Sequence, residues 1–84
     1  MGMRGNAMIT KKEYRALRHC AHEWRYLWDR PLRVGKGCIE GLVARDFVEI
    51  AVPEDRDEQC YKATAVGCAA KAEYFDKFGE VWED

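Results

Sequence analysis

This sequence of 84 residues contains no serine and only two prolines, and its cysteines include no Cys-x-x-Cys pair. The absence of serine excludes the serine hydrolases, and the stretch VGKG at residues 34–37 is too short for a phosphate-binding loop. Cys38 stands near an expected helix start but has no evident base beside it. The longest apolar runs are far shorter than the ~20 residues of a membrane-spanning helix. We therefore expect neither an enzyme nor a membrane protein.

Metal binding has little support in the sequence. The four cysteines, Cys20, Cys38, Cys60 and Cys68, lack zinc-ribbon spacing, and each is expected to be a small, partly buried apolar residue. His19, Cys20 and His22 are ligand types close together, but on a helix Cys20 would point ~100° away from His19. No distant Cys-His pair completes a tetrahedral set. We predict no metal and no cofactor, with zinc at these three residues as the weaker alternative.

The composition is that of one globular domain. Apolar residues make up 48% and charged residues 35% of the chain, a balance unlike that of disordered proteins. The opening MGMRGNAMIT has no apolar segment of the secretory type, so we expect a cytoplasmic protein. The expected organisation is a flexible arm at residues 1–9, a folded domain at 10–79 and a short acidic tail at 80–84.

The near-zero net charge hides an uneven distribution of charge along the chain. Residues 1–37 hold nine Lys and Arg against three Asp and Glu, a net of +6. Residues 38–84 hold five against twelve, a net of −7. Such a split indicates a basic surface that meets an acidic partner, which is nucleic acid, another protein or a second copy of this chain.

A long first helix is predicted to begin after Thr10. Thr10 and Glu13 form a capping box, in which each side chain accepts a hydrogen bond from a free backbone N–H. Apolar residues then recur at helical spacing, at Tyr14, Leu17, Ala21, Trp24, Leu27 and Trp28. The residues before Pro31 should end the helix, because the residue preceding a proline is pushed away from helical angles. The expected helix is about 30 Å long, with both tryptophans in the core.

Another face of this helix is basic. It carries Lys11, Arg15, Arg18, His22 and Arg25 within about 80° of arc, with no acidic residue on that face. Like charges at i, i+4 repel slightly, so the row is either a solvated surface or a contact for an acidic partner. The candidate residues for nucleic acid or an acidic protein surface are Lys11, Arg15, Arg18, Arg25, Arg33 and Lys36.

The remaining chain predicts a short strand, a helix, a hairpin and a final helix. Residues 30–37 should be short and extended, with Leu32 and Val34 facing inward, and a helix at 38–46 should bury Ile39, Leu42 and Val43. Residues 47–52 alternate as a half-buried strand, residues 53–59 form an acidic turn, and residues 60–63 return as a strand. Thr64 should cap a last helix that ends at Gly79, and Val81 and Trp82 are expected to fold back onto the core. The expected fold is α+β, with about three helices and a small antiparallel hairpin.

Residues 31–74 resemble a winged-helix domain of the kind found in bacterial and phage transcription regulators, such as the MarR and PadR groups. IEGLVARDFVEI at residues 39–50 is similar to the end of their recognition helix and the start of the wing. YKATAVGCAA at residues 61–70 is similar to their Tyr-x-Leu-Thr-x-x-Gly closure. The resemblance covers about half of the chain and implies a winged-helix-like fold and a DNA-associated regulator of prophage or mobile-element type. Winged helices also serve as protein-contact modules.

This sequence departs from the winged-helix pattern at three places. The helix-turn-helix is abbreviated, because only residues 30–37 separate its expected helices, and Asp46 stands where a glycine commonly turns the chain. The exposed side of residues 36–45 shows few of the Arg, Lys, Asn and Gln side chains that read base edges. Gly37, Gly41 and Ala44 instead make a flat patch on which the first helix or a partner could approach closely.

The acidic turn opposes DNA binding at the position where a wing normally contacts phosphates. It carries Glu54, Asp55, Asp57 and Glu58 against Arg56. We therefore expect any DNA binding to be weak, non-specific and sensitive to salt, through the basic first helix. Two functions remain open: a DNA-associated regulator, or a protein-binding winged helix that forms a dimer or docks as an inhibitor on a larger complex.

Overall fold

The computed structural model describes residues 9–31 and 33–79, and over these residues the chain is an α+β fold of three helices and one three-stranded antiparallel sheet. The elements are α1 (Lys11–His19), β1 (Arg25–Tyr26), α2 (Lys36–Ala44), β2 (Val48–Ala51), β3 (Cys60–Ala63) and α3 (Ala65–Phe78). The predicted class and element order are confirmed. Residues 1–8 of the predicted arm at 1–9, the predicted tail at 80–84 with Val81 and Trp82, and Leu32 lie outside the described residues. Ile9, the last residue of the predicted arm, is buried in the core, so the prediction is wrong at that position.

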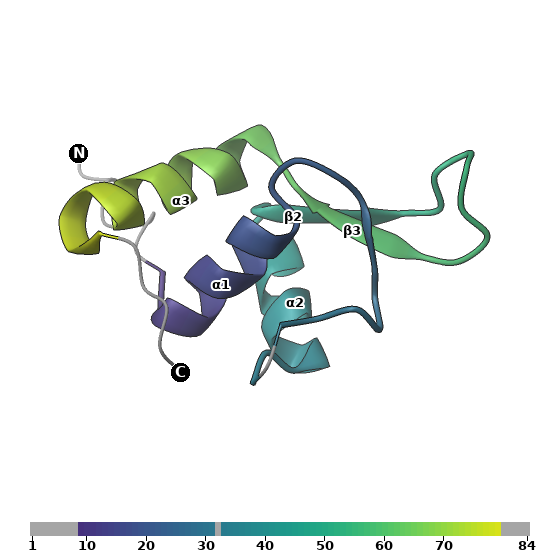
Figure 1. Ribbon diagram of the computed structural model, residues 1–84, viewed down its shortest axis with the longest axis horizontal. Coiled ribbons are helices and arrows are strands. Elements are labelled where there is room, and N and C mark those ends of the chain that lie inside the picture. The colour runs from purple at the N-terminus through teal and green to yellow at the C-terminus, as the bar shows by residue number, and fades with distance from the viewer. Residues whose placement is uncertain (1–8, 32, 80–84) are drawn as a thin grey trace.

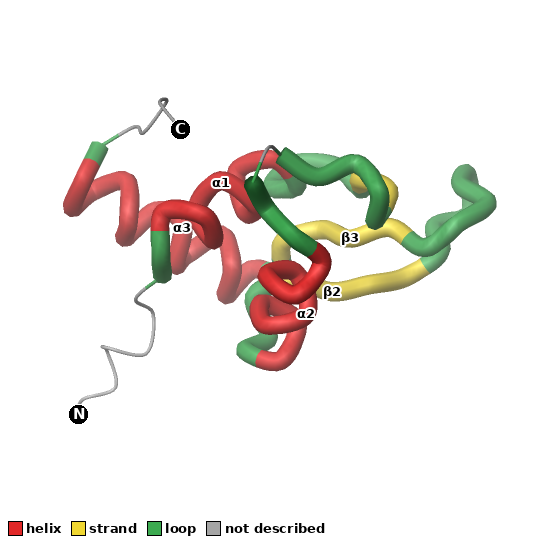
Figure 2. Tube along the Cα trace, turned by 90° about the horizontal axis from the view of Figure 1, so that it is seen from below, coloured by secondary structure: helices red, strands yellow, loops and turns green. Residues whose placement is uncertain are grey.

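The helices gather at one end of the molecule and the hairpin projects from the other. Helix α1 packs against both α3 and α2, and the turn between β2 and β3 lies farthest from the C-terminal end of α3 (Figure 1). The strand order is β1-β3-β2, so β3 is the central strand. Figure 2 shows the strands beside the helices and the turn at their far end. The acidic turn therefore extends away from the helical part of the fold.

The first helix begins as predicted and ends much earlier. Both hydrogen bonds of the capping box are present: Thr10 N donates to Glu13 Oε1 at 2.8 Å, and Glu13 N donates to Thr10 Oγ1 at 3.2 Å. The helix has only 9 residues and ends at His19, with Cys20 as its C-cap. The predicted continuation to Trp28 is wrong, because residues 25 and 26 pair with β3 and the Cys20 carbonyl accepts a hydrogen bond from Ala63 N at 3.0 Å. Sheet hydrogen bonds thus replace helical ones along this segment.

The first strand also lies earlier in the chain than predicted. Its pairs are Arg25 with Tyr61 and Tyr26 with Cys60, whereas residues 31 and 33–35 form no strand. Val34 is nevertheless buried, as its inward position predicted. The side chain of Arg30 holds this connection, with Nε donating to the Val34 carbonyl at 3.2 Å and Nη1 donating to the Leu27 carbonyl at 2.5 Å.

The second half of the chain follows the sequence prediction closely. The returning strand occupies residues 60–63, and Thr64 Oγ1 accepts a hydrogen bond from Gly67 N at 3.0 Å as the cap of α3. Gly79 ends that helix. Asp46 adopts a left-handed backbone with φ 68°, which places Thr64 Oγ1 2.7 Å from its carbonyl oxygen. Asp thus fills the position that a glycine commonly takes.

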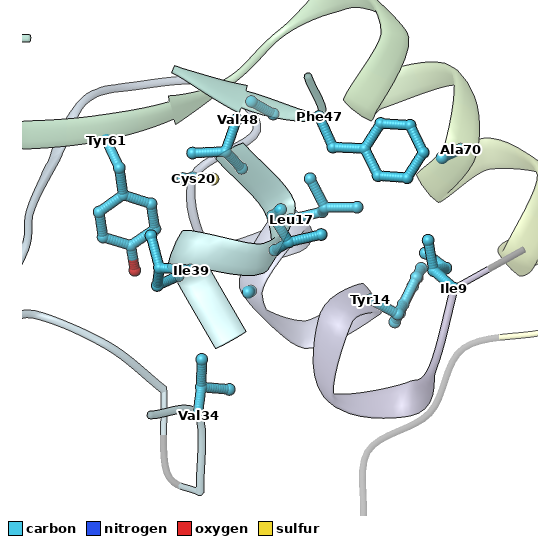
Figure 3. Packing of buried hydrophobic residues seen from close by; sticks show 13 residues of the cluster. Ile9, Tyr14, Leu17, Cys20, Val34, Ile39, Phe47, Val48, Tyr61 and Ala70 are labelled. Carbon is cyan, nitrogen blue, oxygen red and sulfur yellow. The ribbon is translucent and has the colours of Figure 1, made fainter. Parts of the chain in front are cut away.

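The core lies between the three helices and the inner face of the sheet (Figure 3). Its largest fully buried side chains are Tyr14, Leu17, Ile39, Leu42, Val48 and Tyr61. The predicted core position of Trp28 is wrong, because this side chain is 68% exposed. Trp24, also predicted in the core, is only half-buried. Val43, predicted at a buried edge, is 37% exposed. No helix in residues 9–31 or 33–79 has the length and apolar character needed to cross a membrane.

Candidate functional site

The predicted basic face is not continuous, because α1 ends before His22 and Arg25. Within α1, Arg15 is buried with 7% of its surface exposed. Arg18 is half-buried, and its Cζ lies 5.9 Å from the ring centroid of Tyr14. Of the predicted contact residues, the exposed ones are Lys11, Arg33 and Lys36. The structure therefore does not bring the six candidate basic residues together on one helix face.

Arg25 is engaged within its own chain. Its Nε donates to the carbonyl of His19 at 2.9 Å, and its Nη2 lies 3.1 Å from Glu23 Oε2. Its Nη1 lies 3.9 Å from Asp29 Oδ2. His19 Nε2 is buried and lies 3.4 Å from Asp29 Oδ1, but the two atoms do not form a hydrogen bond. These contacts hold the turn between α1 and β1, so Arg25 has a structural role there.

The exposed side of α2 is as poor in base-reading side chains as the sequence indicated. Lys36, Gly37, Glu40, Gly41 and Ala44 are all exposed. A Cβ built at Gly37 or Gly41 would meet nothing within 4 Å among the described residues. The alternative that the first helix of the same chain covers this flat patch is therefore wrong. Its contact with a partner stays a prediction.

The acidic turn is exposed at its four acidic positions, Glu54, Asp55, Asp57 and Glu58. Arg56 is the exception, because it is half-buried and its Nη1 lies 3.9 Å from Cys60 Sγ. Its backbone N donates to the Pro53 carbonyl at 3.0 Å. The guanidinium thus folds back toward the sheet, whereas the four acidic residues stay exposed.

Three aromatic side chains alternate along the segment around β1. We call Trp24, Tyr26 and Trp28 the aromatic row. Tyr26 stands directly opposite Cys60, whereas the next residue of β3, Tyr61, is fully buried in the core. Because neighbouring residues of a strand point to opposite faces, Tyr26 lies on the outer face of the sheet. Tyr26 and Trp28 stack with ring centroids 5.1 Å apart and an interplanar angle of 9°.

Two rings of the aromatic row are already in contact with cations of this chain. Lys62 Nζ lies 5.9 Å from the ring centroid of Trp24, and Arg56 Cζ lies 5.1 Å from that of Tyr26. Both distances are within the range of cation–π attraction. No Lys or Arg within residues 9–31 or 33–79 lies over the ring of Trp28 in this way. Trp28 is also the most exposed residue of the row, with 68% of its surface accessible.

The aromatic row is hydrogen-bonded to the acidic turn. Trp28 Nε1 donates to Glu58 Oε1 at 3.2 Å, and the Tyr26 hydroxyl donates to Asp57 Oδ1 at 3.4 Å. Loss of solvent around the phenol raises the pKa of Tyr26, and the charge of Asp57 adds to this effect. The hydroxyl consequently stays protonated and remains a donor. Rings and carboxylates form one continuous surface.

Sequence reasoning missed this surface because it assigned Trp24 and Trp28 to a helix. The stretch WRYLW at residues 24–28 alternates aromatic and non-aromatic side chains, which is the period of a strand. Leu27, on the other side, packs against the core. This alternation was the sequence signal for a strand. The same residues also fit the helical spacing of the apolar residues before them, so the sequence alone did not distinguish the two.

The cysteines are free thiols, as expected for small apolar residues: Cys20 and Cys60 are buried, and Cys38 and Cys68 are half-buried. Burial raises the pKa of the Cys20 thiol to about 12 and also raises that of Cys38. In the described part of the chain, no three His, Cys, Asp or Glu side chains are placed to hold a metal ion.

Comparison with known proteins gave no match to a protein family, a curated protein or a solved structure.

Proposed function

We propose that this chain is a small, non-enzymatic, winged-helix-like protein-binding module. It docks on a partner protein through the aromatic row and the acidic turn. The proposal of a winged-helix-like scaffold draws on the helix, hairpin and closing helix over residues 36–78, together with the sequence resemblance. The observation that carries the function is Trp28, a large aromatic side chain that is stacked on Tyr26 and has 68% of its surface exposed.

Tryptophan and tyrosine are the residues most enriched at the energetic centres of protein interfaces. A stacked pair has little side-chain freedom to lose when a partner covers it, because the rings are already held in place. Here Tyr26 and Glu58 fix the ring of Trp28 by stacking and by a hydrogen bond. The surface is thus ordered before any partner arrives, which favours binding.

The function as a DNA-associated regulator stays a prediction, but fewer basic side chains now support it. Arg15 is buried and Arg25 is paired within the chain, which leaves fewer basic side chains for phosphates. The exposed side of α2 offers Lys36 as its first residue but no Asn or Gln. The acidic turn would also repel phosphates. These features favour the protein-binding module over the regulator.

The test is a selection of displayed random peptides on the wild-type protein, with counter-selection on Trp28→Ala. Because Trp28 is exposed, the variant should fold normally, which circular dichroism checks. Peptides that bind the wild type and lose affinity for Trp28→Ala are the expected result. If every selected peptide bound both proteins equally, the proposed docking surface would be wrong.

A second measurement examines the regulator. Random-sequence duplex DNA is titrated with the protein at ~50 and ~200 mM salt, with fluorescence anisotropy as the readout. The protein-binding module predicts no DNA binding at either salt concentration. A protein that neutralises about four phosphates would instead lose affinity about a hundredfold over this range. Binding with that slope, unchanged or increased in Asp55→Asn/Asp57→Asn, would favour the regulator.

A further inference from the structure

We propose that Trp28 receives a lysine or arginine side chain of the partner protein, so that the partner segment is basic. This inference rests on the proposed protein-binding function and specifies the partner's chemistry. The cation lies over the indole ring while the acidic turn provides the opposite charge around it. Two independent features support this assignment: the ring contacts of the aromatic row, and the charge of the acidic turn.

The first feature is that two rings of the aromatic row already contact cations of this chain. The ring of Trp24 faces the ammonium of Lys62, and the ring of Tyr26 faces the guanidinium of Arg56. The third ring, Trp28, is the most exposed of the three and has no such cation from the described residues. Tryptophan gives the strongest cation–π attraction of the aromatic side chains. A partner cation over Trp28 would extend the arrangement already present on its two neighbours.

The second feature is the charge beside Trp28. Residues 54–58 carry four carboxylates and one guanidinium, a net of −3. Glu58 lies at the edge of the indole, with Oε1 3.2 Å from Trp28 Nε1, and Asp57 is held by Tyr26. Glu54 and Asp55 are exposed on the same turn. An acidic or neutral segment would gain nothing from this field, whereas a basic segment is attracted and oriented by it.

The position of the turn also fits an extended basic segment. The turn projects at the end of the hairpin, away from the helices, so a partner chain can reach it without contact with α3 (Figure 1). Exposed carboxylates on a projecting turn are strongly hydrated, and each gives only a weak attraction. The ring of Trp28 adds a contact at which a cation's alkyl stem also covers apolar surface. The two contributions act on the same side chain of the partner.

The experiment uses a decapeptide of alternating arginine and glycine and its citrulline counterpart, which has the same shape without the charge. Each peptide is titrated into ¹⁵N-labelled protein, and the indole N–H signal of Trp28 is followed by NMR. Trp28→Phe identifies that signal among those of the three tryptophans. We expect the arginine peptide to shift it and to bind about threefold or more tightly than the citrulline peptide.

Variants of the protein separate the ring from the charge. Trp28→Ala should weaken the arginine peptide about threefold or more. Arg56→Gln removes the internal cation from Tyr26 and makes the turn more acidic, so it should strengthen binding. Glu54→Gln/Asp55→Asn should weaken binding more than Glu73→Gln/Asp76→Asn, a matched pair of neutralisations on exposed positions of α3. Equal losses from both pairs would mean that only net charge matters and would overturn the proposal.

The outcome also separates this inference from the proposed function. Peptides that depend on Trp28 in the selection but lack lysine and arginine would leave the docking surface intact and overturn the basic partner. Equal binding of the arginine and citrulline peptides would do the same. A selection with no peptide dependent on Trp28 would overturn the protein-binding function itself, and the basic partner with it.

Discussion

Gly67 in α3 lies against the carbonyl group of Phe47. A Cβ built on Gly67 would stand 2.0 Å from the Phe47 carbonyl oxygen and 3.1 Å from Leu17 Cδ2. The same oxygen accepts a hydrogen bond from Thr64 N at 3.0 Å, so it cannot move aside without losing that bond. A glycine is required here because α3 begins in direct contact with the chain entering β2.

Gly67→Ala should therefore destabilise the protein by about 2 kcal/mol or more, because the methyl group forces α3 away from Phe47. Urea unfolding monitored by circular dichroism measures the change. Gly41→Ala is the matched control in α2, where a Cβ meets nothing within 4 Å. It should stabilise the protein by about 0.5–1 kcal/mol, since alanine has the higher helix propensity. Equal effects of the two substitutions would contradict the close approach at Gly67.

Asp46 should tolerate glycine and reject a β-branched residue. Its φ of 68° is reached by Asp at a moderate energetic penalty and by a β-branched side chain only with strain. We expect Asp46→Val to lower the unfolding free energy by about 1–2 kcal/mol and Asp46→Gly to leave it unchanged or slightly raised. The same urea titrations measure both variants. Wild-type stability in Asp46→Val would show that the turn can adopt another conformation.

Arg15 and Arg18 should respond differently to charge reversal. The sequence predicted both on one basic face, either solvated or in contact with an acidic partner, yet Arg15 is only 7% exposed and Arg18 is half-buried beside Tyr14. Arg15→Glu should cost about 2 kcal/mol or more, because it places a carboxylate where a guanidinium is buried. Arg18→Glu should cost about 1 kcal/mol or less. Thermal melts of both variants test this, and equal melting temperatures would argue against burial of Arg15.

The pH dependence of stability should show the burial of Cys20. The pKa of its thiol is raised to about 12 in the folded protein, from a usual value near 9. The unfolded chain therefore releases this proton first, and stability decreases as pH rises from about 9 towards 12. By pH 10 the loss should be on the order of 1 kcal/mol. Below pH 8 this group makes no contribution to the slope.

Cys20→Ala is the variant that isolates this effect. Its stability will be lower at pH 7, because a buried side chain is shortened, but its decrease between pH 8 and pH 10 should be smaller than that of the wild type. Urea titrations at pH 7, 8 and 10 give both quantities. Tyr61, whose pKa burial also raises, adds its own decrease only at higher pH. Parallel curves for wild type and variant would mean that the Cys20 thiol is not desolvated.

Local signals predicted the second half of the fold well. Thr64 and Gly79 mark the ends of α3 by capping chemistry, and the alternation of residues 47–52 identifies a strand. These features act over a few residues and need no knowledge of distant parts of the chain. Asp46 was likewise identified from its own tolerance of the left-handed region.

The first half depended on contacts that the local pattern did not contain. No glycine or proline marks the end of α1 at His19, and apolar residues keep helical spacing to Trp28. Residues 25 and 26 form a strand because they pair with β3, which lies far along the chain at residues 60 and 61. The predicted basic face was lost with the helix, and the aromatic row was found only after the strand was known.

The attachment of β1 to the sheet gives the proposed docking surface a dynamic property. β2 and β3 are joined by one turn. β1 has only two residues and is separated from β3 in the chain by α2 and β2. Segments held by few backbone hydrogen bonds open locally at the smallest free energy. The amides of β1 and of Leu27, which donates to the Gln59 carbonyl at 3.2 Å, should therefore exchange with solvent early. A partner that covers Trp28 would stabilise this already paired strand against opening, and slower hydrogen exchange at residues 25–27 would report the complex.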